Sequence, residues 1–162
     1  MRVGEVAALK WQHVDFKTNT IMVRKTQKKS TKGGELLGKP KYNSIRDIVV
    51  SQETMDILKT LKESYGDKIS EYVFSSYRSH WKAISTDTYR DVLQVYKERV
   101  GMTRPFTFHD IRHTNASLMI YAGVPISVVS ERLGHSSVAV TYSTYAHGIN
   151  DCAERRQALV TA

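Results

Sequence analysis

The sequence predicts an α+β fold, a mainly helical single domain with a small three-stranded antiparallel sheet near its N-terminus. From residue 51 onward, apolar residues recur at helical spacing between polar caps and glycine stops. Residues 13–50 instead alternate apolar and polar positions and contain β-branched types, the pattern of strands. With 162 residues, 41% of them hydrophobic, the chain suits one domain with a sizeable core.

The first segment, residues 2–11, places Val3, Val6 and Leu9 on one helical stripe and predicts the end of a helix. No capping residue or turn precedes it, although the first N–H groups of a helix need partners. We therefore expect the chain to be truncated just before Arg2.

Two strands are expected over residues 13–27, joined by the polar turn KTNT, and a third over residues 44–50. The connection between the second and third strands is rich in Lys and Gly and should form a mobile, basic hairpin tip.

Ser51 is the expected cap of a helix that runs to about Ser64, with its apolar positions facing inward: Met55, Leu58 and Leu61. A short strand is expected at residues 72–75. Ser85 or Thr86 should cap the next helix, which runs to about residue 100. One apolar face of this helix consists of Tyr89, Leu93, Tyr96 and Val100. We expect this face to pack into the core rather than to form a platform on which bases stack.

Three further helices are expected over residues 110–121, 126–133 and 138–145, the last weaker because it contains Val, Thr and Tyr. Gly123 and Gly134 follow the first two as stop signals.

The formal charge of +8 is unevenly distributed along the chain, because nine Lys or Arg and a single acid, Glu35, lie between Lys17 and Arg46. Such a strip is typical of a surface that binds a phosphate backbone, and a solvated basic loop is the alternative. The lone Cys152 excludes an internal disulfide framework, and we find neither a membrane-spanning stretch nor a signal peptide. We therefore expect a cytoplasmic protein.

The motif HDIRH places His109, Arg112 and His113 on neighbouring helix surface. His109 and Arg112 could hold an anionic oxygen cluster together. A zinc site at the two histidines is the weaker alternative, because an Arg lies between them and no third ligand follows. For His113 alone we favour a packing role.

Tyr145 lies ten residues after His135 of the LGH motif, and its hydroxyl could attack a phosphate held by His109 and Arg112. Tyr142 lies one helical turn earlier and competes for this role. Spacing alone does not choose between the two tyrosines.

Taken together and in order, RVGEVAALKWQHVDF, KPKYNSIRDI, FHDIRHTNASLMIYAGVPISVVSERLGHSS and TYSTYAH resemble the motifs of the tyrosine recombinases, specifically integrases of phages and conjugative transposons. The resemblance covers essentially the whole chain. It implies that Arg2 is the first active-site arginine, that His109 and Arg112 form the H-x-x-R pair, that His135 is the later histidine, and that Tyr145 is the nucleophile.

The resemblance also implies an active-site lysine on the basic hairpin, where Lys41 is the best match and Lys39 the alternative. Glu5 matches an acid that orients an active-site cation. The family has a separate upstream DNA-binding domain, which this sequence lacks, so residues 1–162 are expected to be the C-terminal catalytic domain. Double-stranded DNA is the implied partner, with self-association on DNA to the family's tetramer.

The implied reaction is site-specific DNA recombination through a covalent 3′-phosphotyrosine, without a metal or other cofactor. Tyr145 would attack, both arginines would neutralise charge, Lys41 would protonate the leaving oxygen and His109 would accept or relay the tyrosine proton. Two alternatives remain, namely an accessory DNA-binding module with an incomplete active site and a nicking–resealing enzyme of the type IB topoisomerase kind.

Overall fold

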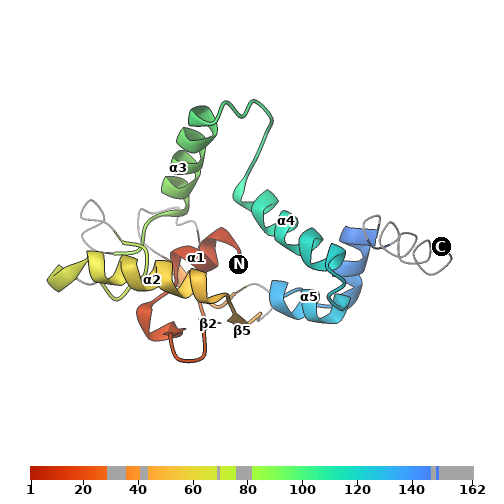
Figure 1. Ribbon diagram of the computed structural model, residues 1–162, viewed down its shortest axis with the longest axis horizontal. Helices are drawn as coiled ribbons and strands as arrows, with labels where there is room; N and C mark the ends of the chain where they lie inside the picture. The colour runs from red at the N-terminus through yellow and green to blue at the C-terminus, as the bar shows by residue number, and fades with distance from the viewer. Residues whose placement is uncertain (29–35, 41–43, 69, 76–81, 147–148, 150–162) are drawn as a thin grey trace. The chain divides into compact units, whose positions relative to one another are not determined.

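A computed structural model describes most of the chain, and its elements are shown in Figure 1. The described residues are 1–28, 36–40, 44–68, 70–75, 82–146 and 149. They fall into two compact units, residues 1–108 and residues 109–162, and each unit is described by itself. Within the described residues, no helix combines the length and apolar character needed to cross a membrane.

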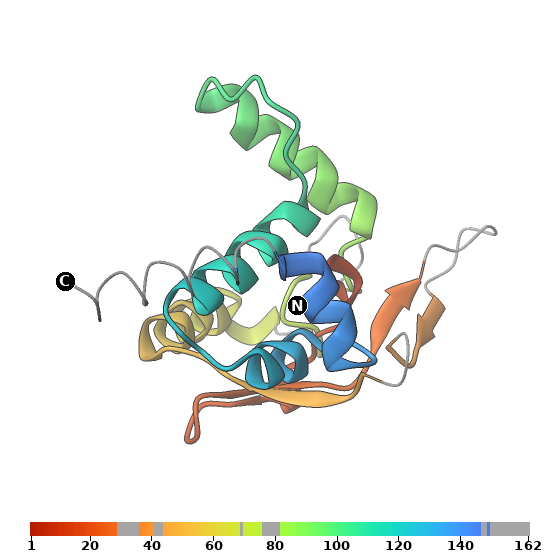
Figure 2. The same ribbon diagram turned by 90° about the vertical axis from the view of Figure 1, so that its right-hand side faces the viewer.

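The first unit contains the expected three-stranded antiparallel sheet (Figure 2). Its strands are β1 (Val14–Asp15), β2 (Thr20–Val23) and β5 (Arg46–Val49), with β2 in the centre. In the register of β2 with β5, Ile21 faces Ile48, and both are buried. The sheet therefore has one buried face, as the alternating pattern predicts.

A second, two-stranded sheet lies in the predicted hairpin region, formed by β3 (Thr26–Lys28) and β4 (Leu36–Gly38). The prediction of one strand across residues 21–27 was wrong in this respect, because β2 and β3 are separate strands with different partners. Alternation continues through both strands, so the pattern does not reveal that the chain changes sheets between them. The tip of the hairpin lies outside the described residues.

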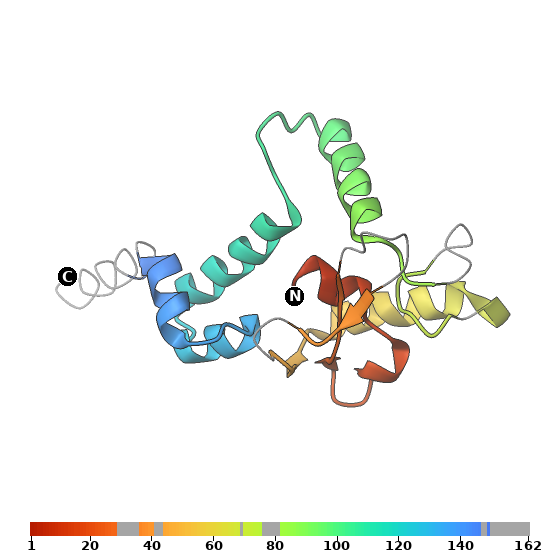
Figure 3. The same cartoon turned by 180° about the vertical axis from the view of Figure 1, so that it is seen from behind.

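Helix α1 (Val3–Ala7) lies against β3 (Figure 3). A Cβ atom at Gly4 would lie 2.6 Å from the carbonyl oxygen of Gln27, so the close approach requires glycine. The chain then passes through a short 3₁₀ turn, η1 (Trp11–His13), into β1.

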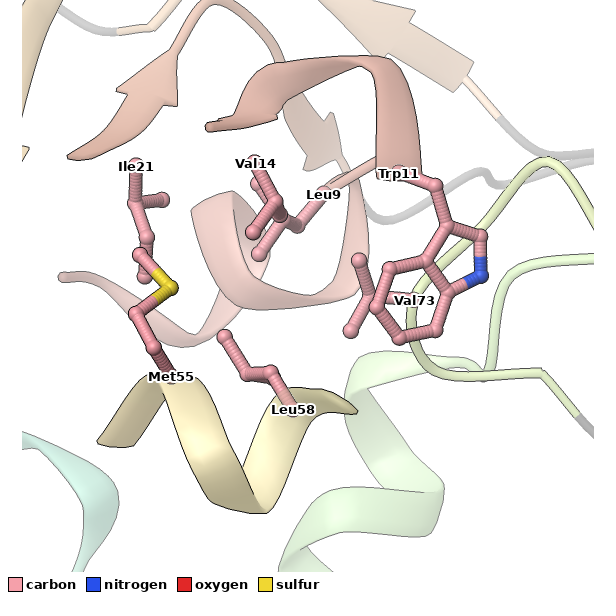
Figure 4. Packing of buried hydrophobic residues seen from close by; sticks show 7 residues of the cluster. All are labelled: Leu9, Trp11, Val14, Ile21, Met55, Leu58 and Val73. Atoms are coloured by element: carbon pink, nitrogen blue, oxygen red, sulfur yellow. The ribbon is translucent and has the colours of Figure 1, made fainter. Parts of the chain in front are cut away.

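Helix α2 (Gln52–Ser64) begins after Ser51, whose hydroxyl accepts a hydrogen bond from the Thr54 amide, which confirms the predicted cap. Met55 and Leu58 face the core, and Leu61 packs at its margin. This core joins side chains from the sheet, α2 and the neighbouring loops (Figure 4): Leu9, Trp11, Val14, Ile21, Met55, Leu58 and Val73.

After a 3₁₀ turn, η3 (Gly66–Lys68), the predicted strand at residues 72–75 is present only as two isolated bridges, Lys10 to Tyr72 and Ser75 to Ala83. Helix α3 (Thr86–Arg99) follows the predicted cap at Ser85.

The predicted core face of α3 was wrong in part. The Tyr89 ring does contact Phe74 and Phe108, with ring centroids 6.2 and 5.9 Å apart. Tyr96 and Val100 are 58% and 70% exposed, and α3 has no fully buried residue. Amphipathic spacing shows that a helix has an apolar face, but not how far along the helix a partner extends.

The described part of the second unit is mainly helical. It contains α4 (Phe108–Tyr121), which starts two residues earlier than predicted, α5 (Ile126–Leu133), and a helical stretch at residues 138–146. Gly134 ends α5 with a positive φ of 66°, as the glycine stop predicts. Their packed residues form a second core: Ala116, Ile120, Val129, Leu133 and Tyr145.

Candidate active site

In the first unit, Arg2 is held by Glu5, one turn further along the start of α1. The Glu5 carboxylate accepts hydrogen bonds from the Arg2 backbone amide at 2.7 Å and from Arg2 Nη1 at 3.0 Å. The Arg2 guanidinium also donates to the Ser44 hydroxyl at 3.3 Å. These contacts hold the Arg2 guanidinium beside Glu5, and the assignment of Arg2 to an active site stays a prediction.

Arg46 completes this group from β5. Its Nη1 and Nη2 donate to the two Glu5 oxygens at 3.2 and 2.9 Å, and Nη1 also donates to the Ser44 carbonyl at 3.0 Å. Glu5 and Arg46 are buried, with 1% and 8% of their surface exposed. Arg46 therefore belongs to the interior and not to the basic strip with which the sequence grouped it.

The ionisation of Glu5 reflects two opposing effects. Burial alone would raise the pKa of Glu5, but the hydrogen bonds and charge of Arg46, and the hydrogen bonds from Arg2, hold that pKa below its usual value. Glu5 is therefore a carboxylate near neutral pH, and it balances part of the charge of two arginines.

Lys41 lies outside the described residues. Lys39 is described and exposed, just after β4.

In the second unit, α4 carries His109, Arg112 and His113. Arg112 is buried, and its Nη2 donates to the carbonyl oxygen of Leu133 at the end of α5. The rings of His109 and His113, one turn apart, meet edge to face with centroids 4.4 Å apart. His109 is exposed and His113 half-buried.

Tyr145 is buried, and its hydroxyl oxygen lies 2.7 Å from Nδ1 of His113, which is hydrogen-bond distance. Burial raises the pKa of the Tyr145 phenol, and the positive charge of Arg112 partly opposes this effect. The Tyr142 side chain is 51% exposed. The two tyrosines therefore differ in a way that spacing alone could not show, because Tyr145 is buried and contacts His113 of α4, whereas Tyr142 is exposed.

His135 lies in the loop after α5, with Nδ1 2.7 Å from the hydroxyl of Thr141. Thr141 is fully buried and precedes Tyr145 by one helical turn, on the same face. The contact therefore links the LGH loop to the helical stretch that carries Tyr145.

Four of the predicted residues, His109, Arg112, His135 and Tyr145, thus lie in the second unit, and Arg2 lies in the first. Sequence reasoning missed Arg46 as the partner of Glu5, and it assigned His113 only a packing role. The sequence features that could have drawn attention to these residues are the SIR motif, which contains Arg46, and the HDIRH motif, which contains His113.

Comparison with known families adds to this geometry. The model of the phage integrase family matches residues 1–150. The chain belongs to the phage integrase family. A XerC-like tyrosine recombinase of Caldanaerobacter subterraneus is 31% identical over 175 residues, which cover 92% of this chain and 43% of the relative. The ICEBs1 integrase of Bacillus subtilis is 28% identical over 154 residues, which cover 91% of this chain and 41% of the relative.

Solved structures place this phage integrase family member in the fold of known recombinases. The Tn1549 transposon integrase, in a complex with transposon right end DNA, superimposes with a TM-score of 0.80 at 19% identity, covering 100% of this chain and 55% of that one. The XerA recombinase superimposes with a TM-score of 0.74 at 25% identity, covering 99% and 53%. The chain thus spans less than half the length of these curated relatives and about half of the solved chains.

Proposed function

We propose that this chain cleaves and rejoins double-stranded DNA in site-specific recombination, with Tyr145 as the nucleophile. The observation that carries the proposal is the position of the buried Tyr145 phenol, whose hydroxyl oxygen lies 2.7 Å from Nδ1 of His113. Burial raises the pKa of this phenol, and the positive charge of Arg112 partly opposes that effect. A cation beside the nucleophile suits attack on an anionic phosphodiester.

In the proposed reaction, Tyr145 Oη attacks a backbone phosphorus, a new O–P bond forms and the bond to the 5′ oxygen breaks. Arg2 and Arg112 neutralise the charge that develops on the phosphate oxygens, and His135 adds a hydrogen bond. Lys41, or Lys39 in its place, protonates the leaving 5′ oxygen. His109 accepts or relays the tyrosine proton.

Rejoining is the same path in reverse, with the 5′ hydroxyl of a new strand attacking the phosphotyrosine. The link conserves the energy of the phosphodiester bond, so the scheme requires no nucleotide. Association of several copies on DNA, as the family resemblance implies, would bring the exchanging strands together.

The test is covalent trapping on nicked DNA. The substrate is a pool of DNA duplexes, each with a randomised centre and one nick. Cleavage near the nick releases a short fragment with a 5′ hydroxyl, so rejoining is prevented and the protein–DNA adduct accumulates. A denaturing gel then shows the adduct. We expect the unaltered chain and Tyr142→Phe to form the adduct and Tyr145→Phe to form none while still binding the DNA. An adduct that survives in Tyr145→Phe but is lost in Tyr142→Phe would contradict the assignment. Binding without any adduct would indicate an accessory DNA-binding module.

A further inference from the structure

We infer that His113, rather than His109, is the group that holds the Tyr145 hydroxyl and takes its proton when Tyr145 attacks DNA. This inference rests on the proposed function and names the proton acceptor of that same site. The distance of 2.7 Å between His113 Nδ1 and Tyr145 Oη is the observation that carries it.

The surroundings of this contact suit a proton acceptor. Tyr145 is buried, and burial raises the pKa of its phenol, so the hydroxyl does not ionise by itself near neutral pH. A neutral imidazole has one ring nitrogen without a proton, and that nitrogen can receive the proton. A general base must lie within about 2.6–3.2 Å of the atom that it deprotonates, a requirement that the His113 contact meets.

His109 is placed differently. Its ring meets the ring of His113, with centroids 4.4 Å apart, and the His113 ring meets that of Tyr145 at 5.6 Å. The exposed His109 therefore lies against the acceptor and keeps a role toward the phosphate or in passing the proton onward.

The O–H bond of Tyr145 breaks and its proton moves to Nδ1 of His113, which becomes an imidazolium. The electron pair left on Oη forms the bond to phosphorus, and the bond from phosphorus to the 5′ oxygen breaks. That oxygen receives a proton from the proposed acid, Lys41. In the rejoining step the imidazolium returns its proton to Tyr145.

The contact itself is tested without activity. In ¹⁵N spectra of the full chain, recorded at alkaline pH, the His113 signals are identified by their loss in His113→Phe. We expect an unprotonated Nδ1 whose shift changes in Tyr145→Phe and not in Tyr142→Phe. A protonated Nδ1, donating to Tyr145, would overturn the inference.

The proton transfer is tested by adduct formation on the nicked DNA pool. We expect His113→Phe, which keeps a ring but has no acceptor, to slow adduct formation by about 100-fold or more. His113→Ala should be accelerated by added imidazole, whereas His109→Ala should not. Circular dichroism confirms that each variant is folded.

The outcomes separate the two proposals. Loss of a general base typically slows a reaction by about 10²-fold or more. A folded His113→Phe variant whose rate stays within about threefold of the unaltered chain would therefore overturn the inference, and so would imidazole rescue of His109→Ala alone. Either result leaves the proposed function standing. If the unaltered chain forms no adduct, the proposed function fails, and the spectra still decide whether His113 accepts the Tyr145 hydrogen bond.

Discussion

The environment of Glu5 differs strongly from that of a glutamate in water. Glu5 is buried, and its carboxylate is bound by the side chain of Arg46 and by the backbone and side chain of Arg2. Removing one member of a buried ion pair costs far more than removing an exposed one, because the remaining charge keeps its desolvation penalty. The same carboxylate therefore stabilises the fold and holds the side chain of Arg2, which we propose is an active-site arginine.

Glu5→Gln keeps the side-chain shape but removes the charge opposite Arg46. We expect the free energy of unfolding near neutral pH to fall by roughly 3 kcal/mol. Glu53→Gln, an exposed position in the first turn of α2, is the matched control and should change it by less than about 0.5 kcal/mol. Urea unfolding curves measure both. Equal effects of the two substitutions would contradict the buried pair.

The pH dependence follows from the sign of the pKa shift. The folded-state pKa of Glu5 is lower than its ordinary value of 4.5, so the stabilisation is present above that value and is lost as pH falls through the folded pKa. The difference in stability between the unaltered chain and Glu5→Gln should therefore shrink on acidification below pH 4.5. A difference that grows instead would show that the carboxylate is not the charged partner of Arg46.

At this scale the sequence predicts some roles and not others. Glu5 is recognisable because it lies one helical turn from Arg2 within a single motif. The contact of His113 with Tyr145 joins residues 32 positions apart and depends on how helices pack, so no local spacing indicates it. For the same reason Arg46 is read as one more surface cation, since its burial is decided by the sheet register.

At the scale of elements, polar caps and glycine stops are the features that the sequence predicts well. Ser51, Ser85 and Gly134 begin or end helices as expected, because capping depends on residues only a few positions away. The separate hairpin of β3 and β4 and the exposed end of α3 were not predicted, because both depend on distant partners.

Helix α2 offers a direct test of which face packs on the sheet. Met55 is 1% exposed in the core, whereas Ile57, two residues later on the same helix, is 68% exposed. Met55→Ala should lower the free energy of unfolding by about 2–5 kcal/mol, because it removes buried apolar surface and leaves a cavity. Ile57→Ala should change it by less than about 1 kcal/mol. Similar losses in both variants would show that α2 is turned differently.

At the scale of the whole molecule, the excess of positive charge predicts how the proposed binding of DNA depends on salt. The excess of cations over acids lies mostly between Lys17 and Arg46, and the exposed members described in that strip include Lys17, Lys25 and Lys28. Arg46 is excluded by its burial, and Arg24 forms an ion pair of 2.6 Å with Asp47. Binding should therefore be electrostatic, weak and strongly dependent on salt.

Titrations of labelled duplex DNA at several salt concentrations measure this dependence. If about five phosphates are neutralised, the logarithm of the binding constant should fall against the logarithm of salt with a slope of about −4.5. Lys25→Gln should make the slope shallower by about one, whereas Lys59→Gln, an exposed lysine on α2, should leave it unchanged. Tight binding that is insensitive to salt would contradict the electrostatic account.

The central claim is that Tyr145 forms the covalent link to DNA, and the most direct measurement is the position of that link. After trapping on the nicked DNA pool, nuclease and trypsin digestion leave a peptide that contains both Tyr142 and Tyr145. Fragmentation in a mass spectrometer then assigns the nucleotide remnant to one residue. We predict that the remnant is on Tyr145, and a remnant on Tyr142, or on any other residue, would contradict the account.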